Sequence, residues 1–322
     1  MKKTISTIIL SSALTASALL LTGNALMAEP SHPSVEDYDF SPVFNPDVPA
    51  SVNFCGKSIK LDRADMYERF DRELASLAYT HGSTLLMIKR ANKYFPRMAE
   101  QLKKNGMPLD LLYLACVESS LNPRAYSPAK AAGFWQFIPS TAKQYGLEVN
   151  DEVDERYDIE KATAAAARYF RGGLAKYGDW PSVMAAFNAG FARITGELDK
   201  QLADNSFDLY LNEETSRYVF RILAMKTILE NPAAYGYHLE ADQLYYPTEC
   251  DVVEVSGPVA DWPVWAKEHG ISYAQLREEN PWIRAKSLTN KSGKTYKVRI
   301  PRADSLYRSK QNKNVYNPNW VK

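Results

Sequence analysis

Residues 109–123 read Leu109-Asp110-Leu111-Leu112-Tyr113-Leu114-Ala115-Cys116-Val117-Glu118-Ser119-Ser120-Leu121-Asn122-Pro123. The apolar side chains predict a short buried helix over 109–119, which Asn122-Pro123 ends. Glu118 shares a face of this helix with Leu111 and Leu114, because positions four and seven residues apart lie above one another. A carboxylate among apolar side chains is uncommon, so Glu118 is the first candidate for a functional residue.

Two effects favour the protonated form of Glu118. It lies in the last turn of the predicted helix, where the negative end of the helix dipole disfavours a carboxylate. Burial among apolar side chains acts in the same direction and raises the pKa of the carboxyl. An acid that stays neutral near pH 7 is what general acid catalysis requires. The alternative is a frayed helix end with Glu118 in water, and position alone favours that alternative.

Helical spacing of apolar residues extends from about Leu61 to Glu230. Within this span Asp158 is expected to cap a helix over 159–177, and Gly178 to close it. Pro96 is expected to begin a new helix, since proline is favoured at the first helical position. No segment of the span alternates as a strand does, so the fold class is mainly α, with an all-α central domain.

A different pattern begins after Pro247 and predicts a separate module over 248–301. It reads as a strand at 252–255, helices at 262–269 and 273–279, and a strand at 296–300. A β-α-α-β unit of about fifty residues is large enough to be a small module of its own. The remaining residues, 302–322, are polar and basic and are predicted to form a solvated tail.

The N-terminus reads as a secretory signal peptide over 1–28. Met1-Lys2-Lys3 precedes an uncharged apolar run, and Ala25 or Ala28 offers the cleavage point. This predicts export to the periplasm or cell envelope, and the absence of a cysteine near the cleavage point argues against a lipid anchor. Residues 29–54 are proline-rich and predict an extended lead before a domain at 55–247, whose core is 100–232.

Composition excludes several classes of protein. The 322 residues carry 39 Lys plus Arg against 38 Asp plus Glu, so no strong field recruits nucleic acid. The four histidines lie far apart, and neither a metal site nor any other cofactor is predicted. Export permits disulfides, and a Cys55–Cys250 bridge is one hypothesis. Cys116 is expected to be a small core residue.

Four motifs, taken in order, resemble one known family. They are Glu118-Ser119, Gly133-Phe134-Trp135-Gln136-Phe137, Ala186-Phe187-Asn188-Ala189-Gly190 and Glu214-Thr215-Ser216-Arg217-Tyr218. Together they resemble the catalytic domain of the lytic transglycosylases, relatives of goose-type lysozyme, and in particular the membrane-bound lytic murein transglycosylase D type. The resemblance covers about residues 55–235 and implies a lysozyme-like all-α domain.

The resemblance also implies a reaction on peptidoglycan glycan strands. Glu118 would be the single acid/base, which protonates the oxygen between N-acetylmuramic acid and N-acetylglucosamine. It would then take the proton of the C6 hydroxyl, which attacks C1 and leaves a 1,6-anhydro end. The supporting residues implied by the motifs are Ser127 beside the acid or substrate, Gln136 beside the cleft, Asn188 facing the reacting sugar and Tyr218 orienting the carboxyl.

The sequence departs from the family pattern at three positions. Lys130 stands where glycine is usual, so the loop is expected to follow a different path. Phe187 replaces a tyrosine and Leu121 replaces a phenylalanine. The C-terminal module is similar to a LysM glycan-binding repeat, but 257–260 lacks the usual turn, which leaves glycan binding and a structural spacer as alternatives.

Two other functions remain open on the sequence. The first is lysozyme-type hydrolysis of the same bond, for which the candidate bases are Asp151, Glu152, Asp154 and Glu155. The second is a peptidoglycan-binding scaffold with an inactive cleft, which the complete set of motif residues argues against. Neither endo- or exo-action nor the oligomeric state follows from the residues, although a monomer is the simplest expectation.

Overall fold

The computed structural model describes residues 44–291 and 293–322. The predicted signal peptide and most of the predicted lead lie outside the described residues. The described chain is mainly helical, as the sequence predicts. Its helices are α1 (Ala64–Tyr79), α2 (His81–Lys104), α3 (Leu112–Ser119), α4 (Pro139–Gln144), α5 (Ile159–Tyr177), α6 (Trp180–Ala189), α7 (Phe191–Gln201), α8 (Glu213–Glu230), α9 (Trp262–Glu268) and α10 (Tyr273–Glu279). Its strands are β1 (Ser51–Phe54), β2 (Lys57–Lys60), β3 (Cys250–Val255) and β4 (Tyr296–Pro301).

A β-hairpin that the sequence did not predict precedes the helices, with β1 at the end of the predicted lead (29–54) and β2 at the start of the predicted 55–247 domain. Strand β1 pairs antiparallel with β2, from Ser51 opposite Lys60 to Phe54 opposite Lys57. The connecting residues Cys55 and Gly56 both have positive φ, 51° and 78°, as a two-residue hairpin turn requires. Phe54 is fully buried and fixes the hairpin to the helical core.

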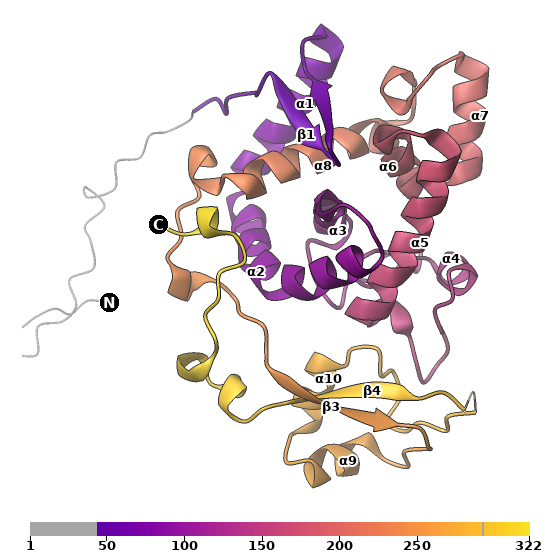
Figure 1. Ribbon diagram of the computed structural model, residues 1–322, viewed down its shortest axis with the longest axis vertical. Helices are drawn as coiled ribbons and strands as arrows, with labels where there is room; N and C mark the ends of the chain where they lie inside the picture. Colours follow the sequence, from indigo (N-terminus) through magenta and orange to yellow (C-terminus); the bar gives the residue numbers. More distant parts are fainter. Residues whose placement is uncertain (1–43, 292) are drawn as a thin grey trace, which may run out of the picture. The chain divides into compact units, whose positions relative to one another are not determined.

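Helix α3 is the centre of the helical domain (Figure 1). The ribbon shows it enclosed by α2, α5, α6 and α8, and its residues Leu114, Ala115 and Cys116 are fully buried. A preceding 3₁₀ turn, Leu109–Leu111, completes the predicted helix. Helix α5 begins and ends as predicted: the Asp158 side chain accepts the Lys161 N–H, and Gly178 follows in the left-handed conformation.

The expectation that Pro96 begins a new helix is wrong. Helix α2 continues through Pro96, although proline cannot donate the backbone bond to the previous turn. The buried face of α2 explains the continuity, since Phe95 and Met98 continue the apolar stripe of Ile88 and Ala91. Burial of that stripe outweighs one missing hydrogen bond.

The C-terminal module has the predicted β-α-α-β order. Strands β3 and β4 pair antiparallel from Cys250 opposite Pro301 to Val255 opposite Tyr296. Helix α9 begins at the Asp261 cap and α10 at a Ser272 capping box. The module core includes Trp262, Leu276 and Val298, and side chains of the helical domain join it, as described below.

The segment predicted to be a solvated tail instead returns to the helical domain. Trp320 is only 2% exposed and lies in a tilted ring contact with Phe95. Its indole N–H donates to the Leu229 carbonyl, and the Tyr316 N–H donates to the Asn92 side chain. The prediction was wrong because it weighed the many polar residues and not the two aromatic anchors.

The three cysteines of the sequence all lie in the described residues and are free thiols. The Cys55–Cys250 bridge is therefore not formed: the Cys55 N–H donates to Asp110 and the Cys250 thiol donates to the Thr248 carbonyl. Cys116 is fully buried, as expected for a small core residue. Over 44–291 and 293–322, no helix has both the length and the apolar character to cross a membrane.

Candidate active site

The last turn of α3 presents Glu118 at the start of a sharp change in chain direction. The helix ends at Ser119, and both Ser120 and Leu121 adopt left-handed conformations, with φ of 51° and 50°. The Ser120 N–H still bonds to the Cys116 carbonyl, which closes the final turn. Leu121 is fully buried and secures the turn, so the position of Glu118 is fixed by the core beneath it.

The carboxyl of Glu118 accepts a hydrogen bond from the hydroxyl of Tyr218, which comes from α8. Desolvation by the surrounding protein raises the pKa of Glu118 to about 7, and the nearby charge of Glu214 adds to this increase. The Tyr218 hydrogen bond acts in the opposite direction, because it stabilises the carboxylate. The result is a half-buried acid that can both give and take a proton near neutral pH.

Tyr218→Phe is expected to raise the pKa of Glu118 further, since the bond that stabilises the carboxylate is removed. A hydrogen bond to a charged group contributes about 1.5–3 kcal/mol, which corresponds to about one pKa unit or more. An NMR titration of the Glu118 carboxyl measures the shift. Tyr177→Phe is the matched control, because its hydroxyl bonds to the Phe191 carbonyl on another part of the domain. An unchanged or lowered pKa in Tyr218→Phe would contradict this assignment.

Asn188 lies in the last turn of α6 and is held by a residue that the sequence analysis did not single out. The Thr215 hydroxyl donates to the Asn188 side-chain oxygen at 2.9 Å. Thr215 precedes Tyr218 by three residues on α8, so both project from one helix face. The first turns of α8 thus hold two site residues, and this i, i+3 spacing was a signal available in the sequence.

Ser127 and Gln136 lie on the loop 125–137 and bond within it. The Ser127 side chain accepts the Ala131 N–H at 3.1 Å, and the Gln136 amide donates to the Gly133 carbonyl at 2.8 Å. Among the described residues, neither side chain hydrogen-bonds to Glu118. The structure therefore brings Tyr218 directly to the acid, whereas Ser127 and Gln136 bond within their own loop.

Arg156 holds this loop from outside, and no sequence signal pointed to it. Its guanidinium donates to the carbonyls of Lys130 at 2.6 Å and Phe137 at 2.9 Å. It also forms a forked ion pair with Asp154, and both side chains are buried. The backbones are in close contact here, because a Cβ on Gly133 would lie 1.9 Å from the Arg156 carbonyl oxygen.

The acidic residues considered as bases for a hydrolytic water are mostly engaged elsewhere. Asp154 is paired with Arg156, and Glu155 accepts from Lys161 and from the Glu148 N–H. Glu152 accepts from Thr289 of the C-terminal module. The carboxylate whose charge acts on Glu118 is instead Glu214.

Comparisons with known proteins agree with these features. Residues 95–207 match the family described as "Transglycosylase SLT domain", and residues 251–304 match "Soluble lytic transglycosylase C-terminal LysM-like domain". The chain carries a transglycosylase SLT domain followed by a LysM-like module. The SLT match spans α3, the loop 125–137 and α6, and it ends before α8.

Two curated relatives and one solved structure are similar to this chain. Membrane-bound lytic murein transglycosylase D of Escherichia coli (strain K12) is 34% identical over 271 residues, which is 80% of this chain and 57% of the relative. Membrane-bound lytic murein transglycosylase F of Shewanella woodyi is 25% identical over 52% of this chain and 35% of the relative. The crystal structure of the 70 kDa soluble lytic transglycosylase of Escherichia coli has 23% identity and a TM-score of 0.37, over 45% of this chain and 24% of that one. The chain thus spans slightly more than half of the length of the first relative and less than half of the length of the other two proteins.

Two departures from the family pattern in the SLT domain have clear structural settings. Lys130 adopts a left-handed backbone, with φ of 62°, so it keeps the type of conformation that glycine favours. Its N–H donates to the Ser127 carbonyl at 2.8 Å. The ring centroids of Phe187 and Phe137 are 5.7 Å apart, and the Phe187 ring also contacts the rings of Tyr169 and Phe170. Phe187, the residue before Asn188, is therefore part of an aromatic cluster.

Lys130→Gly is expected to stabilise the SLT domain by about 1 kcal/mol. The left-handed conformation costs a residue with a Cβ about 1–2 kcal/mol, and the greater freedom of glycine in the unfolded chain offsets part of the gain. Urea unfolding measures the difference. Ala129→Gly is the control, because Ala129 has no positive φ and only the loss from unfolded-state entropy applies. Equal effects of the two substitutions would show that Lys130 is not strained.

Proposed function

We propose that this chain is a peptidoglycan lytic transglycosylase that cleaves the bond between N-acetylmuramic acid and N-acetylglucosamine. The observation that carries the proposal is the half-buried Glu118, whose pKa is raised to about 7 and whose carboxyl is held by Tyr218. The SLT match over α3 and the loop 125–137, and the relatives that are named as lytic murein transglycosylases, support it.

The proposed reaction needs one group that works first as an acid and then as a base. Protonated Glu118 gives its proton to the glycosidic oxygen as the bond from C1 to that oxygen breaks. The Glu118 carboxylate then takes the proton of the C6 hydroxyl, whose oxygen forms a new bond to C1. The acid is regenerated, no water is consumed, and the product is a 1,6-anhydromuramic acid end. A pKa near 7 suits both steps, because neither protonation state is strongly favoured.

Supporting residues have distinct proposed tasks. Tyr218 fixes one carboxyl oxygen of Glu118, and Thr215 turns the Asn188 amide so that its N–H₂ group remains to donate to a sugar. The proposed role of the loop that carries Ser127 and Gln136 is to line the substrate cleft beside Glu118. The intramolecular C6 hydroxyl needs no second carboxylate to activate a water, unlike the paired-acid glycosidases.

Lysozyme-type hydrolysis is the alternative that uses the same acid. It requires a base that activates water. Of the four candidate bases, Glu152, Asp154 and Glu155 are engaged in bonds away from Glu118, and Asp151 is exposed. Glu214 is exposed on the first turn of α8 and is the remaining carboxylate with an influence on Glu118. This arrangement favours transglycosylation over hydrolysis.

Mass analysis of the soluble products from purified sacculi tests the proposal. Products that end in 1,6-anhydromuramic acid are expected. Reducing ends would show that water is the acceptor and would direct attention to Glu214 as its base. A complete absence of soluble products, with the protein still bound to sacculi, would overturn the enzyme assignment in favour of a binding scaffold.

Export to the periplasm or cell envelope, and glycan strands as the binding partner, belong to the same proposal. The signal-peptide pattern of residues 1–28 supports export, and the LysM-like module supports a contact with glycan. Fractionation of cells that express the full chain tests the location.

A further inference from the structure

The LysM-like module is joined to the SLT domain by main-chain hydrogen bonds along one segment, residues 148–157. Val153 forms a β-bridge with Ile283 of the module. On either side of it, the Asp154 N–H donates to the Trp282 carbonyl at 2.9 Å, and the Arg284 N–H donates to the Glu152 carbonyl at 2.8 Å. Such pairing fixes a register, which a flexible tether would not do.

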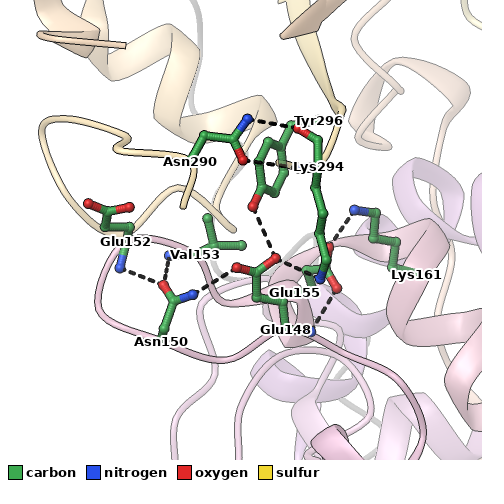
Figure 2. A network of polar contacts seen from close by, with 9 residues as sticks. All are labelled: Glu148, Asn150, Glu152, Val153, Glu155, Lys161, Asn290, Lys294 and Tyr296. Atoms are coloured by element: carbon green, nitrogen blue, oxygen red, sulfur yellow. Dashed lines mark hydrogen bonds and ion pairs between the residues drawn. The ribbon is translucent and has the colours of Figure 1, made fainter. Parts of the chain in front are cut away.

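Polar side chains reinforce the same contact (Figure 2). Glu148 accepts from the Lys294 ammonium at 2.9 Å and from the Tyr296 hydroxyl at 3.0 Å. Glu152 accepts both the N–H and the hydroxyl of Thr289. Figure 2 shows Asn150 between these acids, where it accepts the Glu152 N–H and donates to Glu148.

Apolar burial accompanies these bonds. Val153, Tyr157 and Ala132 of the SLT domain are buried in the hydrophobic core of the module. The Arg284 guanidinium lies 4.5 Å from the centre of the Tyr157 ring. The contact therefore combines a dry centre with a polar edge, which is the composition of a stable interface.

The same segment holds the loop 125–137 on its other side. Arg156 donates to the Lys130 and Phe137 carbonyls and is itself paired with Asp154, whose N–H is bonded to the module. Ala132 lies at the middle of the loop and is buried against the module core. Thus one short segment connects the module to the loop that carries Ser127 and Gln136.

We infer that the LysM-like module acts as a brace for the active site: through residues 148–157, with Arg156 as the positioning residue, it holds the loop 125–137 in its catalytic shape. The consequence for turnover rests on the proposed function, whereas the consequence for the order of the loop does not. When the module is docked, glycan cleavage is efficient. When it is undocked, Glu118 stays in place but the loop 125–137 becomes mobile. Displacement of substrate-positioning groups by about 1 Å is enough to slow an enzyme markedly.

A charge exchange across the contact in the full chain tests this inference. Glu148→Lys places like charges at Lys294, and adding Lys294→Glu to it restores an opposite pair. Lys267→Ala, on the exposed surface of α9, is the control. Hydrogen–deuterium exchange is measured at the amides of Ser127, Ala132 and Gly133, all bonded within the loop, and at slowly exchanging amides of α5.

The expected result is at least about tenfold faster exchange in the loop of Glu148→Lys, with α5 unchanged and the double variant restored. The kcat for soluble glycan should fall about tenfold with little change in KM, and it should recover in the double variant. Arg156→Lys keeps the charge beside Asp154 but loses the forked geometry, so it should loosen the loop with the module still docked.

Two results would overturn the brace. One is fast exchange at the Asp154 and Arg284 amides, which shows undocking, without any change in the loop. The other is slow hydrogen–deuterium exchange in the loop and an unchanged kcat in both the Glu148→Lys and the Arg156→Lys variants. If the loop loosens as expected but the wild type releases no glycan product, the brace stands and the proposed function fails.

Discussion

Glu118→Gln is expected to lower the rate of glycan cleavage by about 10²–10⁴-fold, the usual contribution of a positioned acid/base. Glutamine keeps the size of the side chain and can still accept the Tyr218 hydroxyl, but it carries no transferable proton. Release of soluble products from sacculi measures the rate. Binding of the variant to sacculi should be retained, because the groups proposed to contact glycan are unchanged.

Glu214→Gln is the matched control for this experiment. It removes a carboxylate whose charge raises the pKa of Glu118, so the Glu118 pKa should move down while cleavage persists. A Glu118→Gln variant with near wild-type turnover, or a Glu214→Gln variant with the larger loss, would remove Glu118 from the role of acid/base.

Glu118→Gln is also expected to change how the stability of the protein depends on pH. The pKa of Glu118 is raised from 4.5 to about 7, so between these values the folded chain binds more protons than the unfolded chain. The free energy of unfolding therefore falls as pH rises through this window, by at most about 3 kcal/mol. The Glu118→Gln variant should not show this loss. Its free energy of unfolding should therefore rise relative to that of the wild type between pH 5 and pH 8. Urea unfolding at both pH values measures the difference.

Gly133→Ala is expected to destabilise the protein by about 3 kcal/mol or more. Gly133 has a φ of 74°, which costs an alanine about 1–2 kcal/mol, and the new methyl group would meet the Arg156 carbonyl oxygen at 1.9 Å. Because that oxygen is backbone, the segments must separate, which adds the cost of overpacking. The loop carries Ser127 and Gln136, so turnover should fall as well. Thermal unfolding and product release measure the two effects.

Gly106→Ala separates the two causes. Gly106 has a similar φ of 65°, but a Cβ there would meet no atom within 4 Å. Its loss of stability should be limited to the backbone cost of about 1–2 kcal/mol. Equal destabilisation by the two substitutions would mean that the close contact between Gly133 and Arg156 has no energetic weight.

Local features were predictable from the sequence. The caps Asp158 and Gly178 gave the bounds of α5, and the change of periodicity after Pro247 gave the β-α-α-β module. Glu118 was named as a candidate from its place on an apolar helix face, although that position alone favoured a frayed helix end in water. Each of these signals depends on residues within a few positions of one another, where helix geometry and turn chemistry decide the outcome.

Expectations drawn from composition or from single residues were less reliable. The tail was expected to be solvated because it is polar, yet Trp320 is buried against α2 and α8. Pro96 was expected to begin a helix, yet the buried stripe on both sides of it keeps α2 continuous. In both cases burial of a few large apolar groups outweighed a local preference.

The sequence by itself determined the helical class, the two parts of the chain and the acid on an apolar helix face. The family resemblance implied that Tyr218, 100 residues further along the chain, orients this acid, but only the tertiary structure decided that the two side chains meet and that Arg156 reaches back to Lys130 and Phe137. It also decided that the module is seated on residues 148–157. The physical reason is that a hydrogen bond or a desolvated carboxyl depends on distances in space, which a local pattern of residue types does not specify.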